Sequence, residues 1–74
     1  MDREYAVIDV TNLEECRDNN NIQAIREIFE DAGNRLNQGE EIVLLQTQYD
    51  SPPEFLERIN SRDRLKEIAG YYLP

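Results

Sequence analysis

Residues 22–37, IQAIREIFEDAGNRLN, carry the clearest pattern in the chain. Apolar side chains recur at positions 22, 25, 28, 29, 32 and 36, which is the spacing of one apolar stripe along a helix. The pattern therefore predicts an amphipathic helix over residues 22–37 whose apolar side packs on another layer. Two pairs of opposite charges, four residues apart, would lie on its outer side: Arg26 with Glu30, and Asp31 with Arg35.

Two stretches that favour strands flank this helix. Residues 5–10, YAVIDV, are rich in β-branched side chains, and residues 40–48, EEIVLLQTQ, have a continuous apolar centre that is typical of burial on both faces of a sheet. Between them, Thr11 and Glu14 fit a capping box that would start a short helix ending near Asp18. Strands joined by such a long helical connection are expected to lie parallel.

The last third of the chain favours helices. The tetrapeptide SPPE at 51–54 is typical of a helix start, and Phe55, Leu56 and Ile59 would form the inner side of that helix. A last helix would end at Gly70, and residues 71–73 would form a short edge strand or a tail. The sequence thus predicts the α/β (α+β) class. We expect a single β-α-β-α(-α) domain over residues 1–74, with a sheet of two or three strands, the first two parallel, packed by helices.

Composition narrows the possible functions. The chain has 74 residues, no His and a single Cys, so one chain can assemble neither the usual nitrogen and sulfur metal sites nor a Ser-His or Cys-His pair. We expect no enzyme activity, no metal and no cofactor. A lone Cys also excludes an internal disulfide, which points to a reducing cytoplasm. No stretch approaches the roughly 18 apolar residues of a membrane span, and the N-terminus lacks the pattern of a signal peptide, so no membrane association is expected.

Charge is unevenly distributed along the chain. Residues 1–50 hold 12 acidic against four basic side chains, whereas residues 51–74 hold four of each, so the net charge of −8 lies in the first part. Because affinity for phosphate comes from Lys and Arg, direct nucleic-acid binding is not expected. We expect a small acidic regulatory or inhibitory protein that binds a basic surface of a partner protein, with the profile of antitoxins, immunity proteins and phage antagonists. The candidate residues are Glu14, Glu15, Asp18, Glu27, Glu30 and Asp31.

A chain this short buries only about 60% of the surface that its unfolded form exposes, so its core should be thin. We therefore expect a homodimer or a hetero-complex. One alternative function is a dimeric adaptor or assembly subunit that docks through its C-terminal Arg and Tyr residues, because interface hot spots favour both types. Local pairing of these Arg residues with Glu57, Asp63 and Glu67 is the competing interpretation. The adaptor surface would comprise Arg58, Arg62, Tyr71 and Tyr72, together with Phe55 and Ile59.

A second alternative is a thiol or sulfur carrier that uses Cys16. This residue follows the first strand at the expected helix start, where backbone N–H groups could stabilise a thiolate. Its acidic neighbours Glu14, Glu15 and Asp18 would oppose that by raising the pKa of the thiol. A buried or half-buried structural cysteine is the favoured interpretation, since free Cys is among the most buried residue types.

Two resemblances accompany these readings. A strand, Cys16 at a helix start, a helix, Gly39-Glu40, an apolar strand and a helix resemble the small bacterial sulfur-carrier domains, although Arg17 stands where that family has Pro and the closing strands are missing. Residues 39–44, GEEIVL, are similar to part of the Phd/YefM-type antitoxins, which are small and acidic. We expect the second half of their hairpin to be absent here, because Pro52-Pro53 stands where it would run. Neither resemblance covers half of the chain, so no family residue is carried over.

Overall fold

The computed structural model describes residues 5–74. Its three strands form one mixed sheet in the order β1-β2-β3, with β1 parallel to β2 and β2 antiparallel to β3. The predicted small α+β domain with parallel first strands is confirmed. Along the chain the elements are β1 (Tyr5–Asp9), α1 (Val10–Asp18), α2 (Ile22–Asn37), β2 (Glu41–Gln48), β3 (Ser51–Ile59) and α3 (Arg62–Tyr72).

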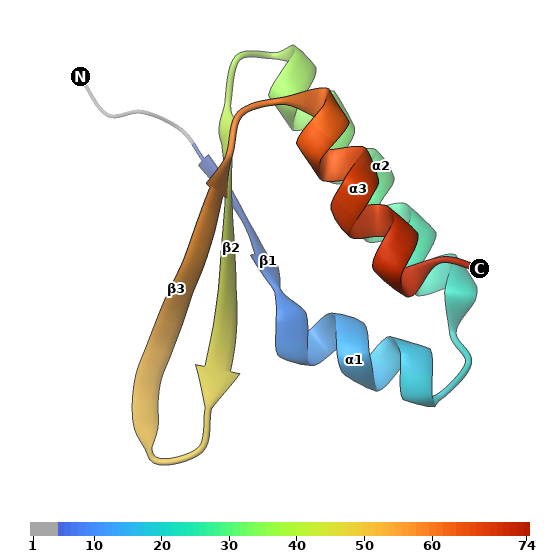
Figure 1. Cartoon of the computed structure of the whole chain (residues 1–74), viewed down its shortest axis with the longest axis vertical. Coiled ribbons are helices and arrows are strands. Elements are labelled where there is room, and N and C mark those ends of the chain that lie inside the picture. The colour runs from blue at the N-terminus through green and yellow to red at the C-terminus, as the bar shows by residue number, and fades with distance from the viewer. Residues whose placement is uncertain (1–4) are drawn as a thin grey trace.

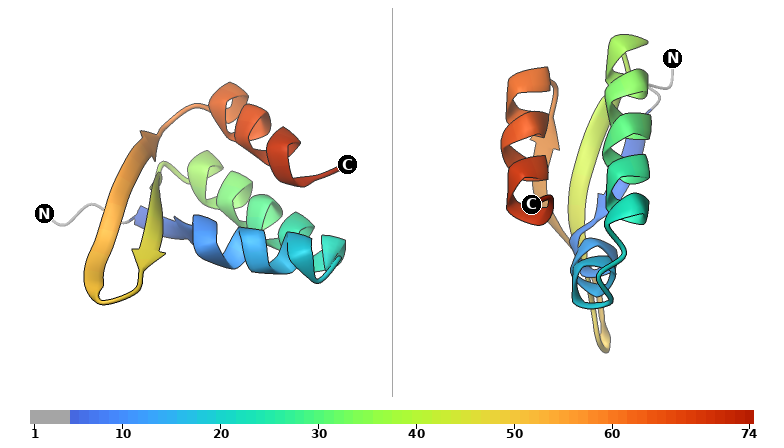
Figure 2. Two further views of the ribbon diagram at one scale, coloured as in Figure 1. Left: turned by 60° about the horizontal axis from the view of Figure 1, so that its bottom comes forward. Right: turned by 90° about the vertical axis from the view of Figure 1, so that its right-hand side faces the viewer.

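All three helices lie on the same side of the sheet. Figure 1 shows α2 and α3 beside each other on that side, and both views of Figure 2 show α1 leaving the sheet on it as well. The core fills the space between the two layers, with fully buried side chains supplied by α1, α2, β2 and β3: Leu13, Ile25, Ile42 and Ile59. No helix within residues 5–74 has both the length and the apolar composition needed to cross a membrane.

The helix predicted over residues 22–37 is α2, with the same bounds. Asn21 caps it by accepting a hydrogen bond from the backbone N–H of Ala24. The expected pair between Asp31 and Arg35 is present at 3.1 Å. Within the described residues, however, no ion pair joins Arg26 to Glu30.

The start of α1 differs from the predicted capping box. Asp9, the last residue of β1, caps the helix: its Oδ1 accepts hydrogen bonds from the backbone N–H groups of Thr11 at 3.0 Å and Thr47 at 3.2 Å. Its Oδ2 accepts one from the Thr47 hydroxyl, and the Thr11 hydroxyl donates to the Thr47 carbonyl at 3.1 Å. Asp9 replaces Thr11 as the cap because its two carboxylate oxygens can serve α1 and β2 together.

The segment predicted as a helix from Ser51 is strand β3, so that prediction was wrong. A two-residue turn between Gln48 and Ser51 folds β3 back on β2, and Asp50 takes a left-handed φ of 59° in it, a conformation that Asp adopts more readily than most residues. Pro52 and Pro53 are tolerated because β3 is an edge strand that pairs only with β2. The hairpin that we expected to be absent, in comparison with the Phd/YefM-type antitoxins, is therefore present.

Pairing with β2 also changes which side chains of β3 are buried. Ile59 is 1% exposed and joins the core, whereas Phe55 and Leu56, expected on the inner side of a helix, are exposed. A register shift between Leu44 and Leu45 lies opposite these two residues. Such a bulge interrupts the alternation of side chains between the two faces.

The last helix also differs from its predicted end. Ser61 caps α3, and the helix continues through Gly70 to Tyr72, so there is neither an edge strand nor a tail at residues 71–72. The Tyr72 ring packs on Phe29 of α2, with their centroids 6.5 Å apart. The stacking of Tyr72 on Phe29 stabilises the continuation of the helix past Gly70. This stabilisation outweighs the free-energy cost of a glycine within a helix.

We expect Asp9→Ala to lower the free energy of unfolding by about 1–2 kcal/mol, the usual cost of a lost helix cap. Partial burial raises the pKa of Asp9, but hydrogen bonds from Thr47 and Thr11 outweigh it and hold the pKa below its ordinary value of 3.8. The contribution of the charged carboxylate is therefore complete well above pH 3.8 and is lost as the pH falls through the lower, folded-state pKa.

Urea unfolding of the wild type and of Asp9→Ala at neutral and at acidic pH measures this effect. The difference between the two proteins should narrow in acid. Asp18→Ala, at the exposed opposite end of α1, is the control and should change stability by less than about 0.5 kcal/mol. A difference for Asp9→Ala that is equal at both pH values contradicts the role given to its charge.

Candidate functional site

The six candidate acidic residues lie on α1 and α2, in the helical layer. Glu14 is half-buried and the other five are exposed. Only Asp31 forms an ion pair with a basic group among the described residues, and Glu27 accepts a hydrogen bond from the Gln23 amide at 3.4 Å. Six carboxylates stand against three basic side chains on these two helices, which gives them a net charge of −3: Glu14, Glu15, Asp18, Glu27, Glu30 and Asp31 against Arg17, Arg26 and Arg35.

Spacing concentrates the negative charge on each helix. On α2, Glu27 lies one turn from both Glu30 and Asp31, and on α1, Asp18 lies one turn from both Glu14 and Glu15. Side chains three or four residues apart are neighbours on a helix surface, and like charges at this spacing repel one another. Each trio is therefore stabilised when a cation approaches it.

Tyr72 has a structural role at the junction of α1 and α3. The Arg17 guanidinium lies 5.3 Å from the centre of its ring, and Phe29 packs against it. Burial, and after it the charge of Glu14, raise the pKa of Tyr72 above its ordinary value of 10.0, while Arg17 opposes them. Glu14 is consequently the candidate carboxylate least available to a partner.

The residues of the alternative C-terminal interface are not gathered on one surface. Arg58 lies on β3 and pairs with Glu41 of β2 at 3.4 Å, whereas Arg62 lies at the start of α3 next to α2. Tyr71 is 74% exposed, but Tyr72 is packed against the core, and so is Ile59. Two residues of the adaptor surface expected from the sequence, Ile59 and Tyr72, are therefore packed in or against the core.

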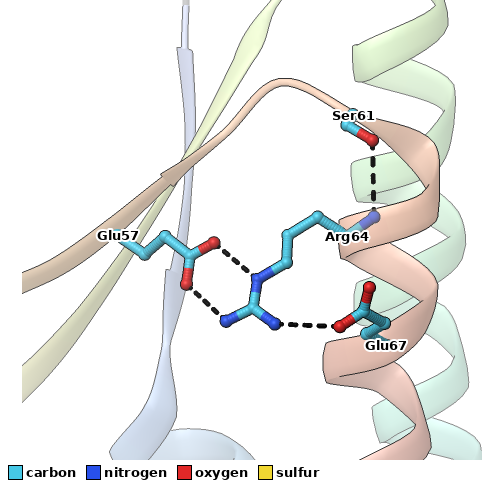
Figure 3. A network of polar contacts seen from close by, with 4 residues as sticks. All are labelled: Glu57, Ser61, Arg64 and Glu67. Atoms are coloured by element: carbon cyan, nitrogen blue, oxygen red, sulfur yellow. Dashed lines mark hydrogen bonds and ion pairs between the residues drawn. The ribbon is translucent and has the colours of Figure 1, made fainter.

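The basic residue Arg64 forms ion pairs with two nearby carboxylates, Glu57 and Glu67 (Figure 3). Its guanidinium donates two hydrogen bonds to Glu57, at 2.6 and 2.7 Å, and one to Glu67 at 3.2 Å. Hydrogen bonds from Arg64 hold the pKa of Glu57 below its ordinary value, and the same bonds raise the pKa of Arg64. Glu57 and Glu67 were expected to pair with neighbouring Arg residues, and the network they form ties β3 to α3.

Cys16 lies in the last turn of α1 rather than at a helix start, so its predicted placement was wrong. Its backbone carbonyl accepts a hydrogen bond from the N–H of Asn21 at 2.7 Å, and its side chain is half-buried against the core. A helix C-terminus presents carbonyl oxygens rather than the free backbone N–H groups that the carrier hypothesis requires. These contacts favour the structural interpretation of this cysteine.

A shallow pocket of about 240 Å³ lies between α2 and α3. Two basic side chains border it, although the chain as a whole is acidic. Sequence analysis missed this pocket, and the available signal was the pair of small residues, Gly33 and Ala69, that leave space between the helices. The lining residues are Phe29, Glu30, Gly33, Asn34, Arg62, Leu65, Lys66 and Ala69.

Across residues 5–74, no three His, Cys, Asp or Glu side chains are grouped so that they could hold a metal ion. No family model, curated protein or solved structure matches this chain. Its function must therefore be inferred from its own residues.

We expect the thiol of Cys16 to react with iodoacetamide at least about tenfold more slowly in the folded protein than in urea, because the side chain is half-buried and lacks an activating donor. Mass spectrometry of samples quenched over time measures the rate. Asp18→Cys in a Cys16→Ala background gives the rate of an exposed thiol on the same helix. A native Cys16 that reacts faster than this reference would restore the carrier hypothesis.

Proposed function

We propose that this chain is a non-enzymatic regulatory or inhibitory protein of the cytoplasm that binds a basic surface of a partner protein through α1 and α2. One observation carries the proposal. Four exposed carboxylates on these helices form no ion pair within the described residues, and they lie within two like-charged trios: Glu15, Asp18, Glu27 and Glu30.

The mechanism is electrostatic steering followed by charge pairing. Unpaired carboxylates attract a basic partner over roughly one Debye length, about 10 Å at moderate salt, and so raise the association rate. On contact, Lys or Arg of the partner relieves the repulsion within each trio. Core residues such as Leu13 and Ile25 hold α1 and α2 in place, so the backbone that carries the carboxylates is already fixed. Binding a partner therefore costs little backbone conformational entropy.

The alternative functions draw less support from the packing. An adaptor surface that includes Tyr72 and Ile59 would have to expose side chains that now stabilise the fold. A carrier that uses Cys16 would need a thiol with activating donors, whereas this one lies at the carbonyl end of α1. The acidic helices require no rearrangement.

The proposal predicts that neutralising the α2 trio slows association with the partner by about tenfold or more at low salt, and much less at high salt. The chain is first used as bait in its native lysate at both salt concentrations, and the association rate of the captured basic protein is then measured by surface plasmon resonance. The variant combines Glu27→Gln, Glu30→Gln and Asp31→Asn.

A matched control removes the same number of negative charges elsewhere on the molecule. If the position of the charge matters, the control should bind nearly as fast as the wild type. Equal slowing by both variants would reduce the effect to net charge, and an association rate that does not change with salt would refute electrostatic docking. The control combines Asp50→Asn, Glu54→Gln and Asp63→Asn.

A further inference from the structure

The sheet has an apolar face on the side away from the helices. Figure 1 and Figure 2 show all three helices on one side of the sheet, and no described element covers the other side. The register places Val7 beside Val43 and Leu45 beside Phe55, so these side chains form one patch across three strands. We call this patch the outer sheet face; its apolar members are Tyr5, Val7, Val43, Leu45 and Phe55.

This face is unusually exposed for a sheet of this kind. Tyr5 is 59% exposed, Val7 52% and Phe55 58%, while Val43 and Leu45 are half-buried. On the inner face, by contrast, the β2 residues Ile42 and Leu44 are 0% and 8% exposed. Where an antiparallel pair leaves one face of a sheet in solvent, that face is usually polar, whereas here it is apolar.

The shape of the domain agrees with a missing layer. Its principal-axis extents are 38 × 31 × 16 Å, so it is one sheet and one helical layer thick. The continuous apolar run of β2 predicted burial on both faces, and a single chain buries only one of them. Any cover for the second face comes from outside residues 5–74.

We propose that a second copy of this chain covers the outer sheet face, so that the protein is a dimer in which two sheets pack face to face. Charge permits this occupant. The charged groups on the same face are Arg58 and Glu41, which pair at 3.4 Å, and Asp9 at its end, whose carboxylate accepts hydrogen bonds from Thr11 and Thr47. A two-fold axis that runs across the strands keeps the two Asp9 carboxylates at opposite ends of the contact, so the paired charges and the apolar side chains meet at its centre.

The acidic helices do not oppose this contact. Both α1 and α2 lie on the other side of the sheet, so the two copies would keep these helices apart. A basic partner protein would instead be drawn to the acidic helices, which makes it a poor occupant for this apolar face. The prolines of β3 also disfavour extension of the sheet edge to edge at that strand.

The available area lies at the lower limit of a specific contact. Complete burial of the three exposed and two half-buried apolar residues, with the Arg58 and Glu41 stems, would remove roughly 500 Å² per copy and about 1,000 Å² in total from solvent, which is the smallest area expected of a biological interface. The dimer is independent of what the acidic helices bind. Failure of either proposal therefore leaves the other standing.

Light scattering coupled to size-exclusion chromatography tests the dimer on the full chain. The wild type should show twice the chain mass of 8.7 kDa. Val43→Glu and Val43→Lys each place like charges opposite each other at the centre of the face, and each should raise the dimer dissociation constant by about 100-fold or more.

Mixing the two variants is the decisive step. Glu on one copy then meets Lys on the other, so the mixture should regain the dimer mass, which also shows that both variants fold. Tyr71→Glu changes an equally exposed aromatic residue on α3 and should remain dimeric. Phe55→Glu, at a 58% exposed position, provides a second disruption of the face should the Val43 variants lose their far-UV circular dichroism spectrum.

Three results would overturn the proposal. The first is a wild type that stays at the mass of one chain at every concentration. The second is a dimer that Tyr71→Glu dissociates and the face variants do not. The third is a pair of folded Val43 variants that remain monomeric when mixed, which would mean that the face does not meet its own copy.

Discussion

The carboxylate of Asp9 joins three elements of the fold: β1, α1 and β2. It terminates β1, caps α1 and binds the backbone N–H and hydroxyl of Thr47 near the end of β2. Without this clamp, the backbone ladder would still pair β1 with β2, but the angle at which α1 leaves the sheet would be set by apolar packing, which is less directional than a hydrogen bond. The position of α1, and so the display of its acidic residues, depends on this side chain together with the core packing of Leu13.

The two faces of the sheet divide the molecule into different chemistries. The inner face and the helices make a core of mostly aliphatic side chains together with Phe29, and the solvent side of α1 and α2 carries unpaired carboxylates. The outer sheet face is apolar and nearly neutral. We propose that the acidic helices bind the partner protein and that the outer sheet face binds a second copy of the chain. The two contacts use different residues, so both can form at the same time.

Local patterns predicted the helical and central parts of the fold, and long-range contacts decided the rest. The period of α2 and the β-branched runs of β1 and β2 are properties of single segments, which is why their bounds were predicted within one or two residues. The SPPE sequence at 51–54 is compatible with both a helix start and an edge strand, and the pairing partner on β2 selected the strand. Likewise, the acidic candidates could be read from composition, but the outer sheet face depends on β3 being a strand.

Contacts in this sheet also differ in sequence separation, which is the number of residues in the loop that closes when the contact forms. The hairpin of β2 and β3 closes across a two-residue turn, whereas Asp9 reaches Thr47 over a separation of 38 residues. Because loop closure costs more entropy as the loop grows, we expect the hairpin to form first and β1 to dock after it. The N-terminal strand would then complete the mixed sheet.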